Sequence, residues 1–176
     1  MALDAPSLPA FGVPEGEAVV GAGLFGAFQG GLLLQLWNTD AIRQVGATAG
    51  WPTLDGGWIV LLCYGVLLAV PFVAFVSGSI DAFATRIIVL SRNSAVLQRL
   101  LVPLLKVSAL GTTLFALGQV YGLLVAVTVW GVALPAWLTL VVGRAVPFPY
   151  VNPFTLFAWA TYGGMTGLAY GLILEH

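Results

Sequence analysis

Hydrophobic residues in this chain fall into long uninterrupted runs that are separated by polar segments. A helix that crosses a bilayer needs about 20 consecutive apolar residues, and four runs meet that length. They cover residues 18–37, 58–76, 107–131 and 154–173. The pattern therefore predicts an all-α, polytopic integral membrane protein with four transmembrane helices, folded as a single transmembrane domain over residues 1–176.

The third run leaves an alternative open. Residues 107–142 carry no charge, and as one helix they would far exceed the ~30 Å thickness of the hydrocarbon core. Pro135 is the best position for an interruption, and the residues after it would then form a short interfacial or kinked extension. A break at residues 118–122 would instead give five spans, but it would draw Lys106 toward the bilayer centre at a cost of about 3 kcal/mol.

The connections between the runs differ in character. Residues 38–57 form a polar, glycine-rich connection, whereas residues 77–106 hold most of the basic side chains, namely Arg86, Arg92, Arg99 and Lys106. Apolar positions recur at helical spacing in 77–106, which predicts an amphipathic segment that lies in the membrane interface between the second and third spans. Basic residues mark the cytoplasmic side. We therefore expect this connection, the N-terminal segment 1–17 and both termini to be cytoplasmic, with the protein in the plasma membrane.

Composition strengthens the membrane interpretation and excludes several kinds of chemistry. Of the 176 residues, 60% are hydrophobic and 7% are charged, whereas a soluble chain has about 25% charged residues. The formal charge of -1 offers no basic surface for nucleic acid. Cys63 is the single cysteine, and the single histidine, His176, belongs to a terminal stretch that reads like an affinity tag. We therefore predict no catalytic residues, no metal site and no cofactor, and expect that the protein is not an enzyme.

Small residues recur every four positions on three of the predicted spans. The rows contain Gly26 and Gly30 on the first span, Gly118 and Gly122 on the third, and Gly163, Gly167 and Gly171 on the fourth. In lipid, helices associate where small residues let their backbones approach closely. We predict that these glycines are helix-packing positions, either inside one four-helix bundle or, for a surplus row, at an interface between subunits.

Polar side chains inside the predicted spans are few and uncharged. Gln29 and Gln119 lie in similar glycine-rich stretches, and Tyr64 and Tyr162 each precede a glycine at a similar offset in the second and fourth spans. These four residues are candidates for a pore or a binding site. The competing interpretation is that the amides bond to neighbouring helices and that the tyrosines are packing or interfacial anchors.

The closing part of the chain resembles a known group of proteins. Residues 147–153 (PFPYVNP) and 162–170 (YGGMTGLAY), with 135–138 (PAWL), are similar to the C-terminal hairpin of uncharacterised small membrane proteins of halophilic archaea. In that family the last helix tends to read His-x-x-Tyr-Gly-x-x-x-Gly-x-x-Tyr. Here Ala158, Trp159 or Ala160 stands at the expected position of the histidine, so a function that depends on it lacks support. The resemblance covers roughly the last 70 residues and implies no activity.

Two functions fit the sequence. The first is a non-catalytic membrane subunit or scaffold that associates through its glycine-rich helix faces, with room for lipid or a hydrophobic cofactor between helices. The second is a small channel or transporter for a neutral solute, with a path near Gln29 and Gln119. The lack of charge inside the spans disfavours a proton- or ion-coupled transporter and is compatible with a pore for a neutral solute. We favour the first function. The expected partners are therefore membrane lipid and either further copies of the chain, in a homo-oligomer, or a larger membrane complex, with no nucleic acid.

Overall fold

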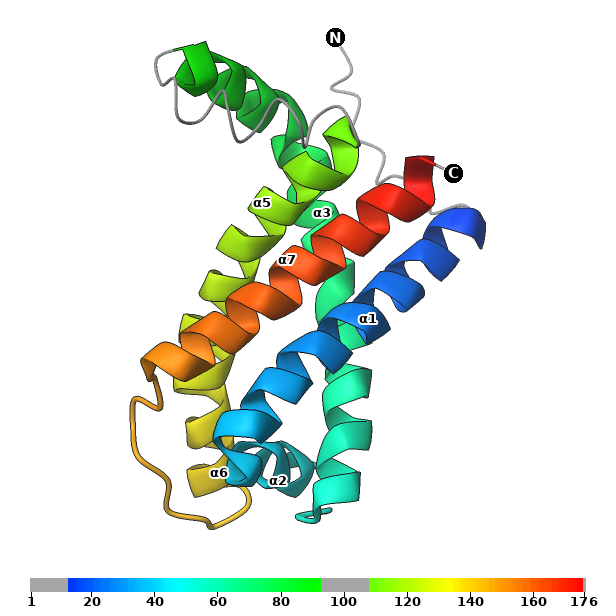
Figure 1. Ribbon diagram of the computed structural model, residues 1–176. Coiled ribbons are helices and arrows are strands. Elements are labelled where there is room, and N and C mark those ends of the chain that lie inside the picture. Colours follow the sequence, from blue (N-terminus) through cyan, green and yellow to red (C-terminus); the bar gives the residue numbers. More distant parts are fainter. Residues whose placement is uncertain (1–12, 93–107, 176) are drawn as a thin grey trace, which may run out of the picture.

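The computed structural model describes residues 13–92 and 108–175, and every regular element in these ranges is helical (Figure 1). The elements are α1 (Val13–Trp37), α2 (Thr39–Thr48), α3 (Leu54–Arg92), α5 (Ala109–Val125), the π-helix η1 (Ala126–Ala133), α6 (Leu134–Leu140) and α7 (Pro153–Glu175). The all-α prediction is confirmed. Three stretches are long and apolar enough to cross a membrane, as expected for a membrane protein, namely Gly16–Trp37, Leu54–Val76 and Leu110–Leu140.

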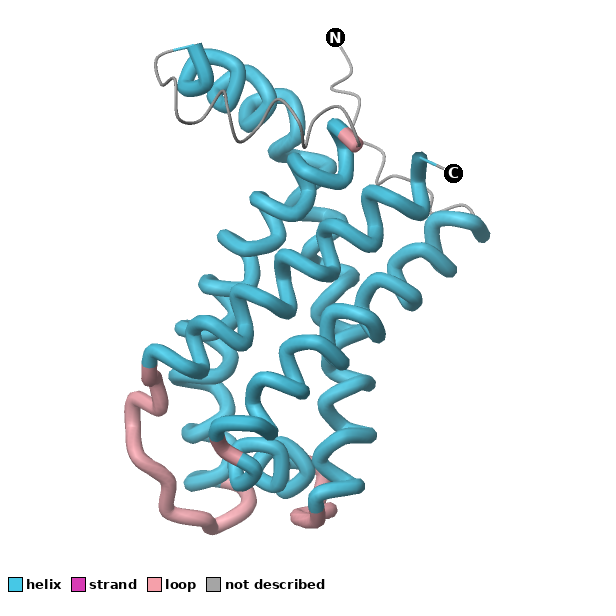
Figure 2. The backbone as a smooth tube through the Cα atoms, in the orientation of Figure 1, coloured by secondary structure: helices cyan, strands magenta, loops and turns pink. Residues whose placement is uncertain are grey.

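The long helices lie side by side, with α7 between α1 and α5 (Figures 1 and 2). α7 packs along both of these neighbours, and α3 packs against α1. In contrast, α3 and α5 make few contacts with each other. The bundle is therefore packed least tightly between α3 and the run that begins with α5.

α7 is the predicted span that does not appear among the three apolar stretches. It has no charged residue before Glu175, but its glycine, threonine and tyrosine residues make it less hydrophobic than the others. Its side chains are well buried in the bundle, since Ala158, Tyr162 and Thr166 are at most 2% exposed. α7 is therefore the inner helix of the bundle, packed along both α1 and α5.

The predicted packing glycines lie where helices approach most closely. A Cβ added to any of them would come within 3.0 Å of an atom of a neighbouring helix, and this holds for Gly26, Gly30, Gly118, Gly122, Gly163, Gly167 and Gly171. The pairs on α1 and α5 both face α7. All seven are buried, and their close contacts are with other helices of the same chain. A further close contact, between Gly23 and Gly65, joins α1 to α3.

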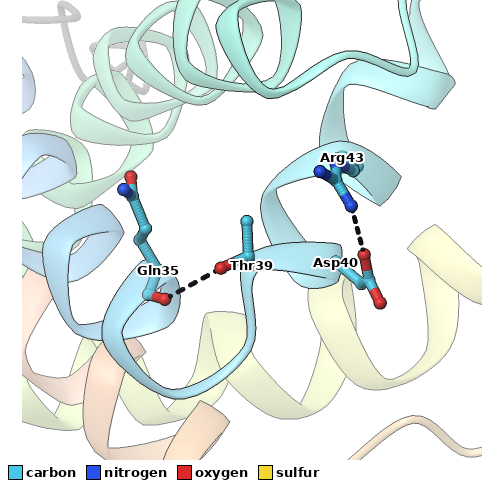
Figure 3. A network of polar contacts seen from close by, with 4 residues as sticks. All are labelled: Gln35, Thr39, Asp40 and Arg43. Carbon is cyan, nitrogen blue, oxygen red and sulfur yellow. Dashed lines mark hydrogen bonds and ion pairs between the residues drawn. The ribbon is translucent and has the colours of Figure 1, made fainter.

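Residues 39–48 form a helix where a polar connection was predicted. The buried side of α2 consists of Ala41, Ile42, Val45, Gly46 and Ala47. On the other side, Arg43 forms an exposed ion pair of 2.9 Å with Asp40, and the Thr39 hydroxyl donates a 3.2 Å hydrogen bond to the Gln35 carbonyl (Figure 3). The sequence did not indicate this helix within the connection, because α2 is too short and too polar overall to stand out as an apolar run.

α3 is longer than the predicted second span. It contains 39 residues, which corresponds to about 58 Å at ~1.5 Å per residue. Residues 77–92 continue this helix and leave the bundle at the upper left of Figure 1. The predicted amphipathic segment 77–106 therefore does not begin as a separate element, because helical hydrogen bonding continues through its first part. Residues 93–107 lie outside the described residues.

The third predicted span also continues beyond its expected end. α5, η1 and α6 follow one another without a gap to Leu140, so helical structure is interrupted neither at Pro135 nor at residues 118–122. The break needed for five spans is thus not observed. Before Pro135 the helix widens, and the Leu134 N–H bonds to the Val129 carbonyl five residues earlier. This π-helical turn accommodates a proline, which has no N–H to continue the α-helical pattern.

Candidate functional site

A cavity of about 410 Å³ lies between α3 on one side and η1 and α6 on the other. We call it the lateral cavity. Its wall is formed by Val45, Thr48, Leu61, Tyr64, Leu67, Leu68, Val129, Trp130, Ala133, Leu134, Trp137 and Trp159. These residues come from five elements, α2, α3, η1, α6 and α7. The volume falls within the range of about 300–1,000 Å³ that is common for small-molecule sites.

The lateral cavity extends from the interior of the bundle to its outer surface. In its wall, Trp130 and Trp159 are 1% and 5% exposed, whereas Leu67 and Trp137 are 63% and 49% exposed. Other apolar side chains of the elements that form the cavity are also exposed, such as Ile59 and Val70 on α3 and Val132 on η1. The lateral cavity is therefore open to the outside of the bundle beside Leu67 and Trp137.

Hydroxyl groups in the cavity wall form a short hydrogen-bonded chain. The Thr48 hydroxyl donates its proton to the Val45 carbonyl at 2.6 Å, so Tyr64 must be the donor in the 2.8 Å bond between the Tyr64 and Thr48 hydroxyls. In addition, Trp137 Nε1 donates to the Thr48 carbonyl at 3.2 Å. The bonds connect α2 to α3 and α6 and leave neither hydroxyl proton free.

Two tryptophans of the wall have indole N–H groups without a hydrogen-bond acceptor among the described residues. The Nε1 atoms of Trp130 and Trp159 are buried and find no acceptor in the described part of the chain. The two rings pack with centroids 5.6 Å apart, and Trp159 also packs edge-on against Tyr162. A buried donor without an acceptor costs about 1–3 kcal/mol. Both tryptophans line the lateral cavity with other ring atoms, because the two Nε1 atoms have almost no accessible surface.

The structure separates the two tyrosines that were candidate site residues. Tyr64 lines the lateral cavity. Tyr162 is 2% exposed, and its hydroxyl donates a 2.8 Å hydrogen bond to the Gly65 carbonyl on α3. Tyr121, on α5, similarly donates to the Leu68 carbonyl at 2.7 Å. Tyr162 and Tyr121 therefore connect α7 and α5 to the backbone of α3.

The structure does not bring the two candidate glutamines together. Gln119 is exposed on α5 and lies beside Gly164 of α7, and Gln29 is half-buried on α1. α7 lies between the two helices that carry them (Figure 1). Neither glutamine lines the lateral cavity. They therefore do not share this space.

Sequence reasoning missed most of the polar groups in the lateral cavity. Trp130 and Trp137 are two helical turns apart, a spacing that places them on one face of a helix. This spacing could have indicated that Trp130 and Trp137 line the same site. Trp159 and Thr48 offered no comparable signal, because they reach the cavity from α7 and α2, which are distant in the sequence.

The described residues contain no group of three or more His, Cys, Asp or Glu side chains placed to hold a metal ion. The Cys63 thiol is exposed on α3. Comparisons with known protein families, curated proteins and solved structures find no match to this chain. The resemblance to haloarchaeal membrane proteins stays a prediction, and the functional argument rests on the lateral cavity.

Proposed function

We propose that this chain is a non-catalytic membrane protein that binds a neutral, lipophilic small molecule in the lateral cavity. The observation that carries the proposal is the cavity of about 410 Å³ with a largely apolar wall and an opening at the outer surface. Binding sites for small molecules are typically concave and mostly apolar, with a few polar groups that set orientation. Here the hydroxyl oxygens of Thr48 and Tyr64 would have that orienting role.

In this proposal, four helical stretches cross the plasma membrane. They are α1, the part of α3 up to Val76, the run from α5 to α6, and α7. The placement of α7 is supported by its position between two of the apolar stretches and by its lack of charge before Glu175. An even number of spans puts both termini on one side, and the basic residues of 77–106 favour the cytoplasm for that side.

The depth of the lateral cavity supports entry of a ligand from the bilayer. Tyr64 lies about 15 Å along the axis of α3 from Leu54, at ~1.5 Å per residue. If Leu54 is near the membrane surface, Tyr64 is well inside a hydrocarbon core of ~30 Å. A lipophilic molecule that is already dissolved in the bilayer would then reach the opening beside Leu67 without leaving lipid.

The buried glycine rows support a compact single-chain bundle as the scaffold of this site. Because the rows are used between α1, α7 and α5, the proposal does not rely on self-association through them. Surrounding membrane lipid and the bound molecule are the partners that it requires. The separation of Gln29 from Gln119 gives the neutral-solute channel no comparable support.

Filling the cavity tests the proposal. Ala133 lines the cavity, whereas the neighbouring Val132 is 45% exposed and does not line it. We expect competable binding of tritiated 2,3-dimethylnaphthalene to immobilised, detergent-solubilised protein. Ala133→Trp should weaken this binding at least about tenfold, because the new side chain occupies the cavity, and Val132→Trp should leave it unchanged. Absence of competable binding to the wild type would overturn the proposal.

A further inference from the structure

We infer that the ligand of the lateral cavity is an uncharged lipophilic alcohol, and that its hydroxyl group donates a hydrogen bond to the hydroxyl oxygen of Tyr64 or Thr48. The inference rests on the proposed function. Its starting point is the hydrogen bonding of the polar side chains that line the cavity. Their protons are already used or out of reach, whereas two of their oxygens can still accept.

The donors of the wall are not available to a ligand. Trp137 Nε1 donates to the Thr48 carbonyl. The Nε1 atoms of Trp130 and Trp159 have almost no accessible surface. The hydroxyl protons of Thr48 and Tyr64 are both directed to oxygen atoms of the protein. A carbonyl oxygen in the cavity would therefore gain a hydrogen bond only if an existing one were broken.

The two hydroxyl oxygens, in contrast, keep unused acceptor positions. A hydroxyl group has one proton to donate and two lone pairs that can accept. Thr48 Oγ1 accepts one bond, from Tyr64, and Tyr64 Oη accepts none in the described part of the chain. Both residues line the cavity and are half-buried. They are therefore the side-chain partners left for a ligand, and the group that fits them is a donor.

The rest of the wall determines which kind of donor fits. The residues that line the cavity include no Lys, Arg, Asp or Glu, so an ammonium group would be buried without a counter-charge. An amide N–H is accompanied by a carbonyl, and the wall has no free donor for that carbonyl. A hydroxyl group carries a proton and no charge, which satisfies both conditions.

The inner part of the cavity accommodates the apolar body of the alcohol. Val45, Leu61, Trp130 and Trp159 are at most 5% exposed and form the most deeply buried part of the wall. The two hydroxyl-bearing residues are more exposed than these four. The apolar body would thus pack against the buried residues, where the tryptophan rings favour a flat ring system, and the hydroxyl group would lie nearer to the opening.

A matched pair of probes tests the assignment. 6,7-Dimethyl-2-naphthol and its methyl ether, 2-methoxy-6,7-dimethylnaphthalene, share a ring system and an oxygen, but only the naphthol has a proton to donate. The double variant Thr48→Val/Tyr64→Phe removes both acceptors, because either hydroxyl alone could replace the other. We expect the Kd of the ether divided by that of the naphthol to be about 2- to 10-fold lower in this variant than in the wild type, the net worth of one hydrogen bond.

This ratio is the decisive quantity, because partial unfolding would weaken both probes alike and detergent takes up each probe equally in every variant. The matched control, Thr161→Val/Tyr162→Phe, makes the same two exchanges on α7, where the hydroxyls bond to carbonyls outside the cavity. It should change the ratio less than twofold. A ratio within twofold of the wild type in the cavity variant, or an equal decrease in the control, would overturn the alcohol assignment and leave the proposed function intact.

Competitors with one shared hydrocarbon chain test the absence of charge. 1-Decanol should displace tritiated 2,3-dimethylnaphthalene at a lower concentration than decylammonium or decanoate. Stronger displacement by either ion would overturn the uncharged class. Absence of competable binding of 2,3-dimethylnaphthalene to the wild type would overturn the proposed function itself, and the inference with it.

Discussion

The backbone N–H of Tyr150 donates a 3.1 Å hydrogen bond to the carbonyl of Gly131. In an α-helix that carbonyl would accept from the residue four positions later, which is Pro135, and proline has no N–H. The Gly131 carbonyl is therefore available to accept a hydrogen bond from the loop between α6 and α7. The Tyr150 hydroxyl also accepts a 3.1 Å bond from Asn38 Nδ2. Pro135 thus helps to anchor the loop to η1, next to the cavity residue Trp130.

Replacing Pro135 with alanine should release this anchor. Pro135→Ala introduces an N–H that competes with Tyr150 for the Gly131 carbonyl, and the lost bond is worth about 0.5–1.5 kcal/mol. We expect hydrogen exchange of the Tyr150 amide to become up to about tenfold faster. Pro71→Ala, a substitution inside α3, is the control and should not affect Tyr150. Equal exchange in the wild type and Pro135→Ala would show that the loop is held by other contacts.

Helices could be predicted where their residues form long apolar runs. Long apolar runs predicted α1 and the apolar parts of α3 and α5, because a bilayer selects for length and hydrophobicity. The same criterion could not detect α2. Its buried apolar face is short, and the exposed charged residues Asp40 and Arg43 interrupt it in the sequence. The criterion placed the end of the second apolar stretch at Val76, where the structure has it, but gave no sign that α3 continues to Arg92.

The site was harder to predict than the helices. Tyr64 could be selected as one of few polar residues in a predicted span. The significance of Trp130 and Trp159 depends on the absence of a nearby acceptor, which is a property of the packed neighbourhood and not of the residue type. Gln29 and Gln119 were selected because both lie in glycine-rich stretches. Those glycines pack α1 and α5 against α7, so the two glutamines lie on helices that α7 separates.

Glycine contacts give a direct test of the packing. In Gly167→Ala the new Cβ would meet the Leu114 carbonyl of α5, and forcing the helices apart should cost about 1–3 kcal/mol. Gly16 has no atom within 4 Å of an added Cβ, so Gly16→Ala should be neutral or slightly stabilising because alanine favours helix. Thermal unfolding in detergent should show a lower Tm for Gly167→Ala alone. Equal Tm values would contradict the close contact between α5 and α7.

Tyr162 is expected to contribute to stability and not to ligand binding. Tyr162→Phe removes the hydroxyl that bonds to the Gly65 carbonyl, and interhelical bonds of this kind contribute about 0.6 kcal/mol on average. We expect a small decrease in Tm with no change in the Kd of 2,3-dimethylnaphthalene. Tyr64→Phe is the comparison within the cavity wall, since it breaks the bond to Thr48. A larger loss of binding in Tyr162→Phe than in Tyr64→Phe would refute this division of roles.

The orientation in the membrane can be tested with two engineered cysteines. Cys63 is exposed and must first be replaced by serine. Arg92→Cys places a thiol at the C-terminal end of α3, and Ala145→Cys places one in the exposed loop after α6. These positions lie at opposite ends of the bundle (Figure 1). If the basic residues of 77–106 are cytoplasmic, an impermeant maleimide should label Arg92→Cys only in inside-out vesicles and Ala145→Cys only in intact cells.

Each pattern of labelling has a separate meaning. Exchange of the two sides would reverse the proposed orientation and keep the spans, because both thiols would still be on opposite faces. Labelling of both thiols from one side would contradict the spans, since the helical run from α5 to α6 would then fail to cross the bilayer. A tag on the N-terminus and one on the C-terminus should share the side of Arg92, because α1 and α7 each add one crossing to the apolar parts of α3 and α5–α6.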